Sequence, residues 1–425
     1  MNLDAATYRD NIPRLAQTPT LRGTAYDRWR SGRLSVIGGG MLGQRFVAEA
    51  VLSGAAVEVC DFDSFSSDNS GTQWGPAGVN KADWLRRSMD RSQATGGHTE
   101  GGHRGRITAR TIDVRRLGVG EFSGFDLIVD CSDDPALVPW LVRLSNGIGV
   151  PLLRAALDGS GQMEMGRVVC SHGAAETSCM LCPYSVTDLF RGTVRTPCNP
   201  FASRSATAPT LAGNAIASVI AGVALLQSQR IVGRMELDQV LGREIIVDLS
   251  HGRLLTIERP RVEKCLSGHR RWELTPIGRS ASDLTLGELF QEAMRRLRTE
   301  RVVLEPFGHA LHEEARCECG NSTAAAGTQW AAPPKCRDCR RPMHWVAETS
   351  SHCLDSNHWL DRSQSAPQAT RRERQRTMRR TLRQLGFPER GAMIAARAID
   401  RKPLQMILSA GLGPSVSPPE GALCR

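Results

Sequence analysis

Three cysteines near the middle of the chain suggest a metal site and a reactive thiol. Cys179 and Cys182 enclose two residues, a spacing typical of one half of a tetrahedral zinc site. Cys198 follows in a loop between Pro197 and Pro200, with arginines close by in the sequence. Neighbouring cations lower the pKa of a thiol, and a thiolate in a partly exposed loop is nucleophilic. We therefore interpret Cys198 as a catalytic thiol; the alternative is an incidental buried cysteine.

A glycine-rich loop upstream predicts a nucleotide site. Gly38, Gly40 and Gly43 fit the G-x-G-x-x-G pattern and follow an apolar segment, 33–37, that predicts a strand. Glycine lets the backbone approach phosphates, and the N-terminus of the following helix offers amide donors to them. Asp61 ends the next predicted strand, where an acid can bind the ribose hydroxyls. These features fit a nicotinamide cofactor and ATP equally well.

Acidic residues after a later predicted strand favour ATP with Mg²⁺. The sequence of 129–134 is Val-Asp-Cys-Ser-Asp-Asp, which places three carboxylates at the end of that strand. Ligands of open α/β sheets bind at this edge, and clustered carboxylates suit a magnesium ion on a triphosphate. We interpret Asp133 as the magnesium ligand with Asp134 beside it, and Lys81 as a cation for the phosphates. The alternative for Asp134 is to cap the next helix.

Strands and helices alternate along the first part of the chain. The segment 33–60 predicts a strand, a helix and a second strand, and further strands are expected at 107–112, 125–130 and 151–156. This alternation predicts an α/β fold with a doubly wound, Rossmann-like and mainly parallel sheet. A small zinc-binding α+β region is expected after it.

A second group of cysteines lies nearer the C-terminus. Cys317, Cys319, Cys336 and Cys339 have the number and spacing of a zinc ribbon. Cys353 is an alternative ligand to Cys317. Such ribbons dock proteins or nucleic acids, and composition does not choose between the two.

Composition limits the class of protein. No apolar segment follows a basic start, and the longest apolar stretch, Ala215 to Leu226, is too short to span a bilayer, so we expect a cytoplasmic protein without membrane contact. Its 13 cysteines should be reduced, and Cys60, Cys131 and Cys170 lie in apolar strands as core residues. The net charge of +10 comes largely from the run 371–380, which is interpreted as a solvated helix. Nucleic acid is not expected as a partner, since no aromatic residues interleave with this run.

In this order, the motifs resemble the ThiF/MoeB/HesA superfamily of ubiquitin-activating-enzyme-like adenylyltransferases. The resemblance spans about residues 33–270 and includes the glycine loop, 61–63, 68–73, the acidic cluster and the three cysteines. It implies that Asp133 holds Mg²⁺ and that Cys198 accepts the acyl group. It also implies that ATP is lined by Gly40, Asp61, Asn69, Gln73 and Lys81.

The resemblance also implies how the first zinc site is completed. Family members supply a second cysteine pair after a helix of small residues, and here 265–269 has the sequence Cys-Leu-Ser-Gly-His. We therefore expect a structural Cys₃His site. Its ligands are Cys179, Cys182, Cys265 and His269.

Three positions depart from the family pattern. Thr72 stands where members have an arginine that contacts the phosphates, Met41 replaces a glycine, and Asp134 replaces an asparagine. Loss of the arginine removes a charge that stabilises the triphosphate during reaction. Arg86, Arg87 or an arginine of a partner subunit are alternatives for that charge, and an inactive relative is the remaining interpretation.

The resemblance leads to a domain division and a function. We expect an N-terminal arm at 1–30, a ThiF-like adenylation domain at 31–275, a small zinc-ribbon-containing domain at 280–360 and a basic helical tail at 361–425. The leading hypothesis is a homodimeric enzyme that adenylates the C-terminal glycine of a ubiquitin-like β-grasp protein. It then forms a thioester on Cys198 for transfer to a conjugating enzyme. The alternatives are a sulfur-carrier adenylyltransferase for thiamine, molybdopterin or tRNA thiolation, a nicotinamide-dependent oxidoreductase, and a non-catalytic zinc scaffold.

Overall fold

The chain divides into two compact units. The first comprises Met1–Val114 and Phe122–Arg271, and the second Arg115–Glu121 and Trp272–Ala422. This computed structural model describes residues 18–95, 106–158, 163–172, 177–185, 212–360, 368–398 and 401–408. Cys198 and its loop lie outside the described residues.

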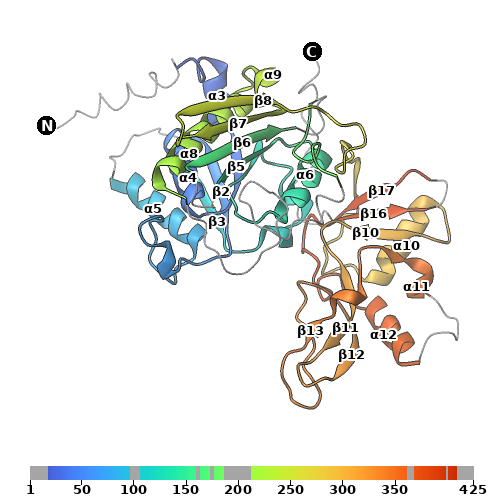
Figure 1. The fold of residues 1–425 in the computed structure, drawn as a ribbon. Coiled ribbons are helices and arrows are strands. Elements are labelled where there is room, and N and C mark those ends of the chain that lie inside the picture. The colour runs from blue at the N-terminus through green and yellow to red at the C-terminus, as the bar shows by residue number, and fades with distance from the viewer. Residues whose placement is uncertain are drawn as a thin grey trace. The chain divides into compact units, whose positions relative to one another are not determined.

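An eight-stranded sheet forms the centre of the first unit (Figure 1), in the order β3-β2-β1-β4-β5-β6-β7-β8. The first five strands along the sheet, β3, β2, β1, β4 and β5, pair in parallel with their neighbours. Strands β6, β7 and β8 extend the sheet by antiparallel pairing. The strands are β1 (Arg33–Ile37), β2 (Ala56–Cys60), β3 (Ile107–Arg110), β4 (Leu127–Asp130), β5 (Leu152–Leu157), β6 (Met165–Ser171), β7 (Arg243–Asp248) and β8 (Arg253–Glu258). The predicted α/β class with a mainly parallel sheet is confirmed.

Helices cover both faces of this sheet. They are α3 (Thr24–Ser31), α4 (Met41–Leu52), α5 (Lys81–Thr95), α6 (Leu137–Ile148), α8 (Asn214–Gly233) and the short α9 (Leu237–Val240). Leu34, Val36 and Val129 alternate along their strands and join one core cluster with residues of α4 and α8. Ile128, which precedes Val129 on β4 and points to the opposite face of the sheet, is also buried. Helix α6 packs on β5. Alternate burial on two faces is what a doubly wound sheet requires.

The region predicted as an N-terminal arm contains a helix. Within α3, Ala25, Tyr26 and Trp29 are buried, and the helix packs against α8. The Trp29 indole Nε1 donates a hydrogen bond to the carbonyl oxygen of Ser53 at 3.1 Å. The apolar face was hidden in the sequence because arginines and an aspartate stand between these residues.

Helix α8 is the longest described helix of the unit and is strongly apolar. By length and composition alone it could cross a membrane, but 56% of its most apolar 18-residue stretch is buried inside the protein. It packs against α3, α4, β5 and β6. Ile216, Ile220 and Ala224 lie in the core at 0% exposure, as in a core helix of a folded domain.

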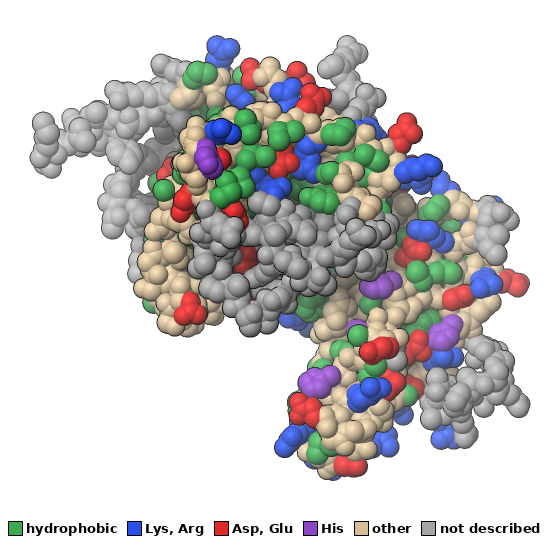
Figure 2. Space-filling view, viewed as in Figure 1, with side chains coloured by type: hydrophobic (Ala, Val, Ile, Leu, Met, Phe, Trp, Pro, Cys, Tyr) green, Lys and Arg blue, Asp and Glu red, His purple; other side chains and the backbone are tan. Residues whose placement is uncertain are grey.

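The edge strand β8 is exposed along its whole length. It is the last strand of the sheet, and Leu254, Leu255 and Ile257 are 63%, 51% and 44% exposed. Hydrophobic side chains gather on the surface over β7 and β8 in Figure 2. These three residues form the exposed apolar surface of β8.

The second unit has its own core around the amphipathic helix α10 (Leu286–Leu297). One sheet has the order β15-β10-β16-β17-β9, and another pairs β12, β11 and β13, with β14 also on β11. These strands are β9 (Leu274–Pro276), β10 (Val303–Pro306), β11 (Leu311–Arg316), β12 (Ser322–Thr328), β13 (His344–Trp345), β14 (Ser350–Ser351), β15 (Leu354–Asp355), β16 (Met393–Arg397) and β17 (Leu404–Ile407). Helices α11 (Ser356–Leu360) and α12 (Gln368–Met378) complete the described part.

The segment predicted as a basic helical tail is helical only in part. Helix α12 covers the basic run, but β16 and β17 follow it and pair with each other and with β10 and β9. Ile394, Ala396 and Met406 are buried in the core of the second unit. The prediction missed these strands because the basic residues before them dominate the composition.

Candidate nucleotide site and metal centres

The glycine loop and the acidic loop meet where the strand order of the sheet reverses. Strand β1 pairs with β2 on one side and β4 on the other, so the loops that follow β1 and β4 leave the same edge. Gly38 has φ +94°, and a Cβ added there would lie 2.9 Å from the Cys131 backbone and from the Ser132 nitrogen. Ligands of doubly wound sheets bind at such a reversal.

The other two motif glycines have different surroundings. A Cβ on Gly43 would lie 1.9 Å from the carbonyl oxygen of Gly38, so glycine is needed for α4 to pack on the loop. Gly40 precedes α4 as its N-cap, without a capping side chain. A Cβ on Gly40 would meet no atom within 4 Å, so the described residues leave this space open to a ligand.

Asp61 and Lys81 flank the glycine loop. The Asp61 carboxylate accepts hydrogen bonds from the amides of Gly39 at 2.6 Å and Asp63 at 2.8 Å. Burial raises the pKa of Asp61, and the two amides and Lys81 oppose that rise. The Lys81 side chain is 14% exposed, with its Nζ 3.7 Å from an Asp63 oxygen. Both predicted residues therefore lie at the glycine loop, and Asp61 binds the backbone of that loop through the Gly39 amide.

The three carboxylates of the acidic loop have separate environments. Asp130 is buried and forms an ion pair with Arg154, and it also accepts from the Ser132 hydroxyl at 2.6 Å. Asp133 is exposed at the loop. Asp134 accepts from the amide of Ala136, the N-cap residue of α6, at 3.0 Å. It therefore closes the turn before the helix and does not cap the first helical amides as the alternative had expected. Asp133 is thus the most exposed of the three carboxylates, since Asp134 is half-buried and Asp130 is buried.

The predicted ATP-lining residues of the 68–73 segment form a turn of their own. The Asn69 side chain accepts from the amide of Ser66 at 3.0 Å, and the Thr72 hydroxyl donates to the carbonyl oxygen of Asn69 at 3.1 Å. Gln73 Oε1 is buried and has no hydrogen-bond partner among the described residues. Orphaned buried acceptors are rare in folded proteins and call for a partner such as a ligand or water.

Arg86 and Arg87, the two alternatives in this chain for the positive charge missing at position 72, have acidic neighbours. Arg86 pairs with Asp83 and Asp90, and Arg87 pairs with Asp83, all on α5. A different arginine, Arg45 of α4, lies at the 68–73 segment. Its Nη1 is 3.4 Å from the carbonyl oxygen of Thr72. Sequence reasoning missed Arg45; the available signal was a cation near the start of the glycine-loop helix, where acidic residues are favoured.

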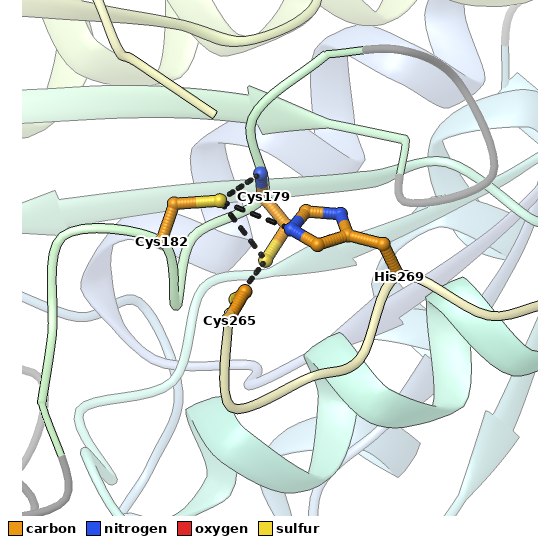
Figure 3. A group of neighbouring side chains, drawn as sticks. All are labelled: Cys179, Cys182, Cys265 and His269. Carbon is orange, nitrogen blue, oxygen red and sulfur yellow. Dashed lines mark hydrogen bonds between the residues drawn. The ribbon is translucent and has the colours of Figure 1, made fainter. Parts of the chain in front are cut away.

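The first four predicted metal ligands converge (Figure 3), with ligand atoms all within 4.8 Å of one another. Cys182 Sγ lies 3.2 Å from His269 Nε2 and 3.9 Å from Cys179 Sγ, and Cys179 Sγ lies 3.6 Å from Cys265 Sγ. Two thiolates bound to one tetrahedral zinc at 2.3 Å are about 3.8 Å apart. The group therefore could hold a metal ion such as zinc.

Local backbone geometry forms this first metal group. The amides of Cys179 and Leu181 point to sulfurs at 3.3 and 3.4 Å, which closes the Cys179–Cys182 turn around the thiols. In the second half, Gly268 has φ +72° and His269 has φ +44°, so the chain turns sharply between the last two ligands. Positive φ favours glycine and makes Gly268 the natural residue in the Cys-x₃-His spacing.

The second predicted metal group also converges, within the second unit. The ligand atoms of Cys317, Cys319, Cys336 and Cys339 lie within 4.8 Å of one another. The first pair follows β11 in the turn to β12, where Gly320 has φ +91° and its amide donates to the carbonyl oxygen of Cys317 at 2.9 Å. The x₁ spacing is therefore accommodated by a glycine turn.

The other cysteines that the structure describes are outside both groups. Cys353, the alternative ligand, lies 3.8 Å from a Glu305 carboxylate oxygen. Cys60, Cys131 and Cys170 are buried, and burial raises the pKa of each thiol, as expected for core residues. The role predicted for Cys198 stays a prediction.

Comparisons with known proteins give distant structural matches. No family model matches the chain, and no curated protein matches it. A crystal structure of E. coli MccB has 12% identity and a TM-score of 0.45, covering 58% of this chain and 67% of MccB. A structure of E. coli MccB with ATP has 13% identity and a TM-score of 0.44, covering 58% and 68% of the two chains. A structure of PaaA has 15% identity and a TM-score of 0.44, covering 61% and 76%.

Proposed function

We propose that the chain is an ATP-dependent adenylyltransferase that activates the C-terminal carboxyl group of a small ubiquitin-like protein. The observation that carries this proposal is the meeting of the glycine loop and the acidic loop at the reversal of the strand order. It brings the N-terminus of α4, a cation at Lys81 and an accessible carboxylate at Asp133 to one edge of the sheet. A nicotinamide cofactor has no triphosphate, and a carboxylate beside it would have no metal to bind.

Each of these groups has a part in adenylation. The uncapped amides of α4 and the Lys81 ammonium bind the phosphate oxygens. Asp133 holds a magnesium ion, which neutralises charge on the triphosphate. The client's carboxylate then attacks the α-phosphorus, an acyl adenylate forms, and pyrophosphate leaves with the electrons of the broken P–O bond. Gln73 Oε1, orphaned in this structure, can accept from a donor of the nucleotide.

The later steps are proposed from the sequence. Cys198 attacks the acyl adenylate to form a thioester and release AMP, and a conjugating enzyme accepts the acyl group next. Zinc in both cysteine groups is structural, since four protein ligands fill a tetrahedral site and leave no position for a substrate. The enzyme acts as a homodimer in the cytoplasm.

The exposed apolar surface of β8 is the proposed contact for the client. Leu254, Leu255 and Ile257 stand on an edge strand whose outer side pairs with no described strand. A β-grasp client offers a sheet and an apolar face, which suit an exposed apolar strand. The sulfur-carrier alternative shares the adenylation step and differs only in the fate of the acyl adenylate.

Calorimetric titration of the full-length protein with ATP–Mg²⁺ and, separately, with NAD⁺ tests the proposal. We expect ATP to bind tightly only with Mg²⁺ present and NAD⁺ not to bind. Asp133→Asn should remove the Mg²⁺-dependent part of ATP binding. Asp90→Asn is the matched control, because Asp90 is exposed and pairs with Arg86 farther along α5. Binding of NAD⁺ in preference to ATP would contradict the proposal.

Pyrophosphate exchange tests the adenylation step itself. With a small β-grasp protein that ends in glycine, exchange of labelled pyrophosphate into ATP should depend on that terminal carboxylate. Blocking the carboxylate as an amide should abolish exchange. If the chain binds ATP but no β-grasp protein of this kind stimulates pyrophosphate exchange, the nucleotide site stands and the adenylation of this client class is refuted.

A further inference from the structure

We propose that Arg45 of α4 supplies the guanidinium that binds the terminal phosphates of ATP in this protein. The inference rests on the proposed function, because it assigns a further residue to the same nucleotide site. Its basis is the position of Arg45, the neutral character of its partners and the way in which it is held.

Arg45 turns back toward the glycine loop. Its Nη1 donates to the carbonyl oxygen of Met41, the first residue of α4, at 2.7 Å, and lies 3.4 Å from the carbonyl oxygen of Thr72. The guanidinium therefore lies beside the first turn of α4, which begins after its N-cap Gly40. No Arg45 atom lies within 4 Å of a Cβ added at Gly40, where the described residues leave open space. Phosphates bind at helix N-termini through backbone amides. The side chain thus adds a full positive charge within one helical turn of that position.

No carboxylate neutralises this charge among the described residues. The hydrogen-bond partners of Arg45 are two carbonyl oxygens, the Ser218 hydroxyl and the Asn214 amide oxygen. Two arginines of this unit that are less exposed than most differ from Arg45: Arg154 pairs with Asp130, and Arg167 pairs with Glu244. Burial lowers the pKa of Arg45, which is the effect of removing a cation from water without an anion to replace the water.

The guanidinium is held in place before any ligand binds. Nε donates to Ser218 at 3.1 Å and Nη2 to Asn214 Oδ1 at 2.7 Å, both on α8. Asn214 also donates to the carbonyl oxygen of Gly71 at 2.8 Å, so α8, α4 and the turn at 69–72 share one network. The Trp74 ring lies 5.4 Å from the guanidinium carbon. A cation fixed by neutral groups is preorganised for an anion, which is more effective than one that must reorient.

This placement accounts for Thr72. A second arginine at position 72 would bring like charge to a site where the carbonyl oxygen of Thr72 already faces Arg45. Arg86 and Arg87 pair with acidic residues of α5 and are 39% and 58% exposed. Arg45 therefore fits the phosphate role better than either of them.

Competitive titration with ATP and adenosine tests the inference in the full-length protein. Arg45→Ala should weaken ATP binding by about ten- to a hundred-fold, the usual effect of losing a charged hydrogen-bond donor. Adenosine, which has no phosphate, should bind within about two-fold of the parent. Arg45→Lys keeps the positive charge but loses the forked guanidinium, so its ATP affinity should lie between those of the parent and of Arg45→Ala. The ratio of the ATP affinity to the adenosine affinity is insensitive to a general effect of the substitution on the fold, because such an effect weakens the binding of both ligands.

Arg86→Ala is the matched control and should leave both affinities unchanged. If the parent binds ATP and Arg45→Ala keeps the same ratio of ATP to adenosine affinity, Arg45 does not bind the phosphates and only this inference is wrong. If the parent binds neither ligand, the proposed function itself is wrong. An equal loss of ATP and adenosine affinity in Arg45→Ala would assign Arg45 a structural role and overturn the inference as well.

Discussion

Replacing Gly43 with alanine should destabilise the first unit, although alanine is the better helix former. The new Cβ would lie 1.9 Å from the carbonyl oxygen of Gly38 and 2.9 Å from its carbonyl carbon. These are backbone atoms of the glycine loop, which is tied to the neighbouring strands by hydrogen bonds. The Gly38 amide donates to the carbonyl oxygen of Cys60, and the Cys131 amide donates to the carbonyl oxygen of Ile37. The loop cannot rotate away as a side chain would, so α4 must move outward by roughly 1 Å.

The expected magnitude comes from two opposing effects. Overpacking against a fixed neighbour costs about 1–3 kcal/mol, with this case at the upper end because the clash is with backbone. Alanine returns about 1 kcal/mol of helix propensity. The net loss in the free energy of unfolding is about 2 kcal/mol, and a unit of this size should then unfold about 4–8 °C lower.

Scanning calorimetry of the full-length protein measures this shift in the transition of the first unit. The matched control is Gly222→Ala in α8, where an added Cβ meets no atom within 4 Å. Gly222 is exposed, so the same substitution should raise the transition by about 2–4 °C. Shifts of the same sign and size in both variants would refute the reasoning, because helix propensity alone would then account for them.

Three further predictions concern the sites. Gly40→Ala should leave the thermal transition in place and weaken ATP binding, because its Cβ enters only the space proposed for phosphate; unchanged ATP affinity would contradict that placement. The purified chain should contain two zinc ions, measured by mass spectrometry of the metal content, and Cys182→Ser or Cys336→Ser should each remove one while Cys353→Ser removes none. Retention of both ions in either of the first two variants would disprove that ligand set. Cys198→Ala should abolish a thiol-sensitive adduct with the client and preserve pyrophosphate exchange, and survival of the adduct would move the acceptor role to another cysteine.

The nucleotide end of the sheet was predictable because its signals are local. The apolar strand 33–37, the three glycines and Asp61 are close in sequence, and the backbone explains the identity of Gly38, Gly43 and Asp61. Gly38 has a positive φ, and Gly43 has no room for a side chain. The cysteine pairs were likewise recognisable from spacing. The two halves of the first group became one site only through a resemblance, because no spacing rule joins residues so far apart.

Other features depend on contacts between distant segments. Arg45 gains its position from Asn214 and Ser218, which lie 169 and 173 residues away. Helix α3 is fixed by its packing against α8 and by the burial of Trp29, and its own sequence has too few apolar residues to predict a helix. Strands β16 and β17 are short and follow a basic run, so their partners in β10 and β9 define them rather than their own pattern.

The place of α8 in the chain has a consequence for synthesis on the ribosome. This helix is apolar enough to resemble a membrane span, and such a segment is hazardous when it emerges without partners. Its neighbours α3, α4, β5 and β6 precede it in the sequence, and only the short α9 among its described helix neighbours follows it. Because chains emerge from the N-terminus at about 5–20 residues per second, these partners are already available when α8 leaves the ribosome. The order of the elements along the chain therefore lets most of this apolar helix be covered as it is made.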